Sequence, residues 1–276
     1  MRYDPGHVRR YFDEYGSREW DRLASSLEGQ VNFHMHQKFL LEYVHSGDRV
    51  LEVGPGPGRF TRELAALGAM IVAFDISSEQ LRLNQERMEY EGMTEFVEAW
   101  IQGDVTDLGR FEDGEFDAVV AYGGPLSYVC DQADRALAEM LRVTRPGGYV
   151  LLSVMSHAGT TRRFLPGILE LAFQHGLEKV DEVTRTGHLR GAVSSGHHCR
   201  MYCWSELRAL LEKHDCDIVT ASASNFLAVQ NEDALRVAHS RSRLWETFLQ
   251  WEERLCQEEG ALDGGTHIIA VLCKRD

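Results

Sequence analysis

The stretch Val50–Gly58, Val-Leu-Glu-Val-Gly-Pro-Gly-Pro-Gly, carries the residues whose chemistry is easiest to interpret. Glu52 lies near the end of a short apolar run, and Gly54, Gly56 and Gly58 follow at every second position. An apolar run that leads directly into glycines predicts a buried strand that turns into a loop. Glycines have no Cβ, so such a loop can bend sharply and let a ligand lie against its backbone. A carboxylate at this place favours a cationic or hydroxyl-bearing ligand over a pyrophosphate.

Two other interpretations of this loop stay open at this point. A dinucleotide-binding loop has the pattern G-x-G-x-x-G, but here the third glycine comes one residue early. Pro55 and Pro57 also remove two backbone N–H donors that a phosphate would need. A glycine-rich turn that binds nothing is the other alternative, because the chain holds 25 glycines in 276 residues.

The loop resembles the first motif of the class I S-adenosylmethionine-dependent methyltransferases. In that family the loop wraps around the aminoacyl and ribose portion of the cofactor. The resemblance implies that Glu52, Gly54, Gly56 and Gly58 bind S-adenosylmethionine.

A second acidic signal, Asp75, lies 21 residues after Gly54 at the end of the next apolar run. An acidic residue at this distance can accept hydrogen bonds from both ribose hydroxyls. The structural alternative is a helix N-cap, but Ser77 or Ser78 suits that role better. The resemblance also implies that Ile76 packs on the adenine.

Two further strand ends complete the pattern. In the family, a pair such as Gly103-Asp104 places the carboxylate near the exocyclic amine of adenine, with the backbone N–H of Val105 on a ring nitrogen. Asp104 could instead be an ordinary turn residue. Tyr122 ends the fourth strand, and the resemblance puts it beneath the sulfonium and methyl groups, where an aromatic face suits a cation. Tyr15, from the N-terminal region, is expected at the mouth of the cofactor site.

Methyl transfer from a sulfonium is an in-line displacement, so much of its acceleration can come from holding the nucleophile in a water-poor site. A base is needed only where the acceptor must lose a proton, and histidine is the usual base near neutral pH. The candidate catalytic residues are His157, His198 and Tyr122, with His188 and His197 also in the segment expected to cover the site. The alternative for any one of the twelve histidines is a structural or solvent-facing role instead of that of a base. The spacing of His197, His198, Cys199 and Cys203 matches no zinc pattern, so no metal is expected.

The composition limits the partners. The net charge of −14 argues against a nucleic-acid surface. No run of 18 apolar residues is present, the first residues lack the apolar core of a signal peptide, and the six cysteines form no C-x-x-C pair. These features predict a cytoplasmic protein with reduced thiols and no membrane partner. The sequence is compatible with a homo-oligomer but does not fix the oligomeric state.

Alternating apolar runs and helix-length segments between residues 47 and 155 predict an α/β fold with a doubly wound, mostly parallel sheet. The expected strands are 48–53, 70–75, 95–101, 117–122 and 148–154, and the expected helices are 59–68, 78–91 and 131–144. Strands 217–222 and 267–273 fit the antiparallel pair that completes the family's seven-stranded sheet.

The remaining segments are expected to be additions to this core. Residues 1–46 form a helical N-terminal cap, residues 47–155 the S-adenosylmethionine-binding core, and residues 156–276 lid insertions plus the last part of the sheet. The lid includes a short helix at 165–175 and a long helix at 232–259. The predicted function is methyl transfer from S-adenosylmethionine to a small-molecule acceptor. The alternatives are a methyltransferase of tRNA or protein and a non-catalytic regulatory subunit.

Overall fold

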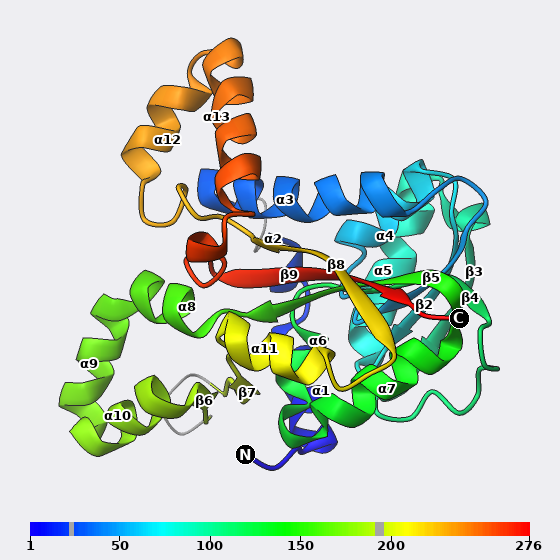
Figure 1. Cartoon of the computed structure of the whole chain (residues 1–276), viewed down its shortest axis with the longest axis horizontal. Coiled ribbons are helices and arrows are strands. Elements are labelled where there is room, and N and C mark those ends of the chain that lie inside the picture. Colours follow the sequence, from blue (N-terminus) through cyan, green and yellow to red (C-terminus); the bar gives the residue numbers. More distant parts are fainter. Residues whose placement is uncertain (22–24, 191–195) are drawn as a thin grey trace.

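The computed structural model describes residues 1–21, 25–190 and 196–276 of the chain. Its main sheet has seven strands, as predicted, and their order is β3-β2-β1-β4-β5-β9-β8 (Figure 1). Five strands are parallel: β1 (Arg49–Val53), β2 (Met70–Asp75), β3 (Val97–Gln102), β4 (Phe116–Ala121) and β5 (Thr144–Met155). The strand order reverses between β1 and β4, and ligands of open α/β sheets bind at such a switch point, beyond the carboxyl ends of the strands.

The last two strands run against the others. Strand β9 (His267–Lys274) pairs antiparallel with both β5 and β8 (Cys216–Ala223). This confirms the predicted antiparallel pair, although a largely helical segment, residues 224–266, separates its two strands in the sequence. This segment therefore leaves the sheet at β8 and returns to it at the neighbouring strand β9.

Helices cover both faces of the sheet (Figure 1). One face packs against α3 (Leu27–Tyr43), α4 (Arg59–Ala66) and α5 (Ser78–Glu91). The other packs against α6 (Pro125–Tyr128), α7 (Ala133–Val143) and α11 (Trp204–Leu211). Successive strand residues point to opposite faces, so Val50 packs on the α3–α4 side and Leu51 on the α7 side.

The N-terminal region is helical, as expected. Helix α1 (Pro5–Tyr15) begins where the Asp4 side chain accepts the His7 N–H, and it is followed by the single turn α2 (Arg18–Asp21). Helix α3 begins at Leu27, because the Ser26 hydroxyl accepts the Gly29 N–H and caps the helix.

Three helices follow β5 where the sequence predicted only one. They are α8 (His157–Arg163), α9 (Leu165–His175) and α10 (Leu177–Thr186), and only α9 had been expected. A short pair of strands, β6 (His188–Leu189) and β7 (Cys199–Arg200), closes this segment. Together α8–α10 form a layer at one end of the molecule (Figure 1).

The predicted long helix at 232–259 is wrong, because the chain turns back between α12 (Glu232–His239) and α13 (Ser242–Leu255). The turn lets Leu235 of α12 and Trp245 and Phe248 of α13 share one apolar cluster with Val31 of α3. A straight helix would carry one of these two groups away from α3. The hairpin is tied to the core by Glu252, a fully buried carboxylate that accepts the N–H groups of Leu227 and Ala228.

None of the helices within the three described ranges combines the length and the apolar character needed to cross a lipid bilayer.

Candidate functional site

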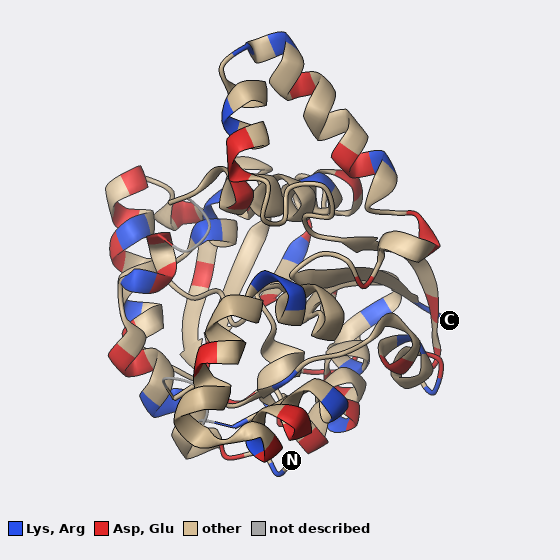
Figure 2. Cartoon of the chain, turned by 90° about the vertical axis from the view of Figure 1, so that its left-hand side faces the viewer, with Lys and Arg blue, Asp and Glu red and all other residues tan. Residues whose placement is uncertain are grey.

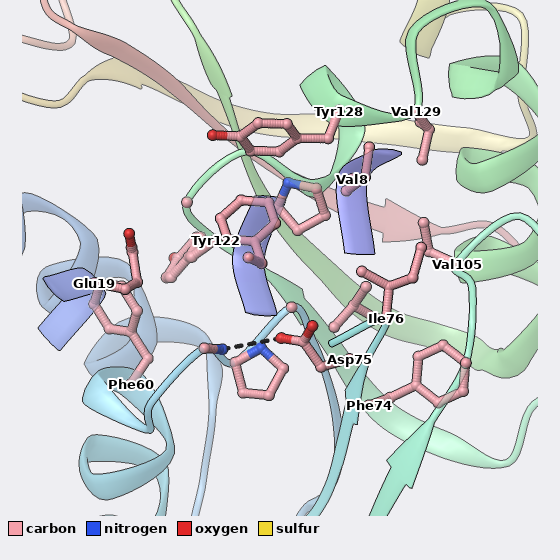
Figure 3. A pocket seen from close by; sticks show the side chains of 18 of the residues that line it. Val8, Glu19, Phe60, Phe74, Asp75, Ile76, Val105, Tyr122, Tyr128 and Val129 are labelled. Atoms are coloured by element: carbon pink, nitrogen blue, oxygen red, sulfur yellow. Dashed lines mark hydrogen bonds between the residues drawn. The ribbon is translucent and has the colours of Figure 1, made fainter. Parts of the chain in front are cut away.

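The loop between β1 and α4 lines a pocket at the switch point of the sheet (Figure 3). Gly54, Gly56 and Gly58 all have positive φ angles, of 66°, 54° and 94°, which side-chain-bearing residues rarely adopt. A Cβ added at Gly54 would lie 2.8 Å from Cγ of Pro125. Gly54 and Gly56 are among the lining residues, so the loop presents bare backbone to the pocket. Gly58 lies further along and is not part of the lining.

Asp75 holds this loop in place. Its Oδ2 accepts the Gly56 N–H at 3.2 Å, drawn as a dashed line in Figure 3, and its Oδ1 accepts the Ser77 N–H at 2.8 Å. Burial raises the pKa of Asp75 to about 6, while these two hydrogen bonds favour its ionised form. Ser77 is the N-cap of α5, as the sequence predicted, so the Asp75 carboxylate is left to face the pocket.

Glu52 lies behind the loop and is not among the lining residues. The carboxylate is buried and accepts the Thr61 hydroxyl of α4 at 2.7 Å. Burial raises the pKa of Glu52 to about 8, and the neighbouring Asp75 adds to the rise. The Thr61 hydroxyl also accepts from Asn84 of α5. The geometry therefore places Glu52 in a polar network that joins β1, α4 and α5.

The side of the pocket expected to hold adenine includes Ile76, Gly103 and Val105. Asp104 is not part of the lining, because Tyr3 of the N-terminal segment covers it. The Tyr3 hydroxyl donates to Asp104 Oδ2 at 2.9 Å, and Asp104 Oδ1 accepts from the backbone and hydroxyl of Thr106. An adenine amine that binds this carboxylate would take the place of the Tyr3 hydroxyl.

Tyr122 lines the same pocket from the end of β4 (Figure 3). Its ring packs between His36 and Phe60, with ring centroids 4.7 Å and 5.2 Å away. Its hydroxyl is buried and has no hydrogen-bond partner among the described residues. Burial holds the pKa of Tyr122 well above its ordinary value, so the hydroxyl stays protonated at neutral pH.

A second, larger cavity of about 730 Å³ adjoins this pocket. Phe12, Glu19, Gly123 and Tyr128 line both spaces. The larger cavity is lined by residues from the N-terminal helices, from α8–α10 and from the segment around Asn225, and Tyr15 faces this cavity rather than the first one. Phe164 also lines the larger cavity, whereas Trp20 lies between the guanidinium groups of Arg59 and Arg87.

A hydrogen-bonded group of three rings lies where the two spaces meet. The Tyr128 hydroxyl is 2.7 Å from His197 Nε2, and the Tyr11 hydroxyl is 3.2 Å from His197 Nδ1. The His197 ring stacks on Tyr128, and all three residues line the larger cavity. No sequence motif marks Tyr128, which lies three residues after Pro125. His197 was expected only as part of the segment that covers the site.

The two histidines expected to act as a base lie elsewhere. His157 begins α8 with its Nδ1 3.9 Å from the Cys203 sulfur, and it lines neither cavity. His198 packs against His7 with ring centroids 5.3 Å apart and is also absent from both linings. Burial lowers the pKa of His198. The role of either residue as a base stays a prediction.

Comparison with known proteins agrees with this geometry. Residues 50–148 match the family model described as a methyltransferase domain. Over 154 residues the chain is 34% identical to the demethylmenaquinone methyltransferase of Clavibacter sepedonicus, and this match covers 55% of this chain and 59% of that protein. Over 146 residues it is 33% identical to the malonyl-[acyl-carrier protein] O-methyltransferase of Pectobacterium atrosepticum, and this match covers 47% of this chain and 54% of that protein. The chain thus spans less than two thirds of the length of either relative.

Residues 50–148 form a class I methyltransferase domain. The fold agrees with a solved N-methyltransferase from Haemonchus contortus in complex with phosphomonomethylethanolamine and S-adenosylhomocysteine. The match covers 89% of this chain and 53% of the chain in that structure, with a TM-score of 0.55 and 17% sequence identity. The domain is of the type that depends on S-adenosylmethionine. Within the described ranges, no group of three or more histidine, cysteine, aspartate or glutamate side chains is arranged to hold a metal ion.

The raised pKa of Glu52 leads to a prediction about stability. The free carboxyl ionises near pH 4.5 and the folded one near pH 8, so the folded protein must keep a proton that the unfolded chain loses. This cost is small below pH 4.5, grows as the pH rises, and is complete above pH 8. Glu52→Gln should therefore raise the free energy of unfolding by about 2 kcal/mol or more at pH 8, since one pKa unit is worth about 1.4 kcal/mol, and by much less at pH 5.

Urea denaturation at the two pH values measures this difference, with the exposed Glu95→Gln as a matched control. A Glu52→Gln variant that is equally destabilised at both pH values would contradict the account of Glu52 as a buried, protonated side chain.

Proposed function

We propose that this protein transfers a methyl group from S-adenosylmethionine to a small-molecule acceptor held in the larger cavity. The observation that carries the proposal is the pocket at the switch point, where the open backbone of Gly54 and Gly56, the carboxylate of Asp75 and the ring of Tyr122 meet. The names of the two bacterial relatives specify demethylmenaquinone and a malonyl group as their methyl acceptors. A small acceptor for this chain agrees with the names of both relatives.

The pocket fits the cofactor in three respects. Its glycine loop presents backbone to the pocket, and each oxygen of Asp75 accepts one backbone N–H and keeps a second lone pair for a hydroxyl donor. Tyr122 presents an aromatic face, to which a sulfonium cation is attracted. When bound, S-adenosylmethionine supplies an electrophilic methyl group on a positively charged sulfur.

The protein's own residues would then orient the acceptor and exclude water. The larger cavity is lined by residues of the N-terminal helices and of α8–α10, and it adjoins the cofactor pocket at Gly123 and Tyr128. An acceptor held there lies next to the methyl end of the pocket in a water-poor site, which favours an in-line displacement.

We assign to Tyr128 and His197 the role of receiving a proton from the acceptor. The acceptor hydroxyl would pass its proton to the Tyr128 oxygen while Tyr128 passes its own to His197 Nε2, 2.7 Å away. The His197 Nδ1–H then points to the Tyr11 oxygen, which stabilises the protonated ring. His157 and His198 are the alternatives to this assignment.

The surface charge bears on the choice of acceptor. In Figure 2 the Lys and Arg positions of the described ranges are interspersed along the ribbon with Asp and Glu positions rather than gathered in one segment. With a net charge of −14, a nucleic-acid acceptor would meet mostly unfavourable charge. We therefore favour a small acceptor over tRNA or protein, a cytoplasmic location, and a catalytic protein over a regulatory subunit.

One prediction of this proposal concerns cofactor binding. Asp75→Asn should weaken the binding of S-adenosylmethionine and S-adenosylhomocysteine by about 10- to 100-fold, because a buried hydroxyl would lose a charge-assisted acceptor. Since the pKa of Asp75 is raised to about 6, wild-type affinity should also fall as the pH drops below 6, and the variant should lose this dependence.

Titration calorimetry between pH 5 and 8 measures both effects, with the exposed Asp107→Asn as the control. NAD should not bind, because Pro55 and Pro57 remove the phosphate donors. Equal affinity of Asp75→Asn and wild type, or tight binding of NAD, would overturn the cofactor assignment.

The second prediction concerns the proton relay. Tyr128→Phe and His197→Gln should each slow label transfer from isotope-labelled S-adenosylmethionine to the small molecules of a bacterial extract by about 100-fold, the usual scale of general-base catalysis. The dissociation constant of S-adenosylhomocysteine should stay within a few-fold of wild type. His198→Gln, one residue away, serves as the control and should retain most of the rate. A His198→Gln variant that loses the rate while His197→Gln keeps it would move the base to His198.

A further inference from the structure

The larger cavity is spacious for a methyl acceptor. Its volume of about 730 Å³ falls in the range of pockets that enclose drug-sized ligands, which is roughly 300–1,000 Å³. A single amino acid or a simple amine would leave most of it filled with water. The cavity therefore suits a molecule with an extended body.

Helix α9 forms one wall of this cavity and has an unusual distribution of apolar residues. Gly167, Ile168 and Leu171 lie at helical spacing on the face that lines the cavity. Leu165 and Leu169 lie on the opposite face and are exposed. No residue of α9 is buried, so the helix gains little from packing on the protein alone. An apolar ligand against Ile168 and Leu171 would supply the missing burial.

Apolar residues continue along the neighbouring walls. The lining also includes Val183 of α10, Leu189 of β6, Met155 of β5 and Met201. Three polar residues of the lining are engaged with one another or with Ser224: Asn32 donates to Ser224 and Thr266, and Asn225 accepts from Thr266. The buried hydroxyl of Thr161 has no hydrogen-bond partner among the described residues, so the lining can offer a polar contact to a hydroxyl group of the ligand.

The charged residues of the lining oppose an anionic ligand. Three carboxylates, Glu19, Glu28 and Glu170, are part of it. Among the lining residues that the structure describes, Arg163 is the sole lysine or arginine, and its Nε is 2.7 Å from Glu28. A carboxylate or phosphate group would thus meet acidic side chains and a cation that is already paired.

Of the remaining two acidic residues, Glu19 lines both cavities and so lies at their junction, and Glu170 accepts the side-chain amide of Gln174, which also lines the larger cavity. A cationic ligand would have to lose its water against the apolar wall of α9 for a carboxylate that is partly satisfied already. The charges thus favour an uncharged ligand over either ion.

From these observations we propose that the acceptor is an uncharged, mainly apolar molecule with a hydroxyl group. Its apolar body lies against α9, and its hydroxyl faces Tyr128 and His197 at the junction with the cofactor pocket. This proposal rests on the proposed function and narrows it, because it separates this acceptor from an anionic substrate such as a malonyl group.

Three probes that share one ring system test the charge preference: 1-naphthol, 1-naphthoate and 1-naphthylmethylammonium. Each is titrated into the whole protein saturated with S-adenosylhomocysteine at pH 7.5, and binding is followed by calorimetry. We expect 1-naphthol to bind at least tenfold more tightly than either ion. An ion that binds as tightly as 1-naphthol would overturn the proposal.

A pair of variants on adjacent residues of α9 tests the location. Ile168→Asp should weaken 1-naphthol binding at least tenfold, because it places a charge on the lining face. Leu169→Asp introduces the same residue into the same helix on the exposed face and should leave the affinity within twofold of wild type. An equal loss in both variants would contradict the assignment of α9 as the binding wall.

A third variant tests the effect of the lining carboxylates through a gain of affinity, which a folding defect would not produce. Glu170→Arg should improve the affinity for 1-naphthoate at least threefold, since it replaces a lining carboxylate with a cation. An unchanged affinity would mean that the acidic residues do not set the preference. Failure of S-adenosylhomocysteine itself to bind would instead contradict the proposed function, so the two failures can be told apart.

Discussion

The site depends on the burial of two carboxylates at the ends of adjacent parallel strands. Strands β1 and β2 pair in register, with Val53 opposite Phe74, so Glu52 and Asp75 come close together at the carboxyl edge of the sheet. Each is almost fully buried, and burial makes an unpaired charge costly. The protein meets this cost in different ways: Glu52 has a pKa raised to about 8, while Asp75 accepts two backbone N–H groups.

The consequence of this arrangement is a fixed loop. The Gly54 N–H donates to the Phe74 carbonyl and the Gly56 N–H to Asp75, so the glycine loop is tied to β2 at two points. The loop then exposes its backbone to the pocket while α4 begins directly after it. The same edge of the sheet carries Tyr122, and residues of the covering helices line the larger cavity beside it.

The core of the fold could be predicted from sequence because its signals are local. Apolar runs that end in Gly54, Asp75, Gly103 and Tyr122 mark the strand ends, and parallel strands bring their carboxyl ends to one edge. The position of Glu52 was harder to predict, because alternate strand residues face opposite sides. Val53 faces the pocket, whereas Glu52 faces Thr61 of α4.

The contacts that complete the site join distant parts of the chain. Tyr128 and His197 are 69 residues apart, and Tyr3 and Asp104 are 101 residues apart. No periodicity or motif spacing reports such pairs, since they depend on how the N-terminal helices and the α8–α10 layer pack over the sheet. The turn between α12 and α13 was missed for a similar reason, because packing on α3 decides it.

The central claim is that the switch-point pocket holds the cofactor with its reactive end toward the larger cavity. A crystal structure of the protein with S-adenosylhomocysteine tests this most directly. We expect the ribose hydroxyls within hydrogen-bond distance of the Asp75 carboxylate and the sulfur beside Gly123, facing Tyr128. A nucleoside bound away from Asp75, or a sulfur turned away from the larger cavity, would contradict the account.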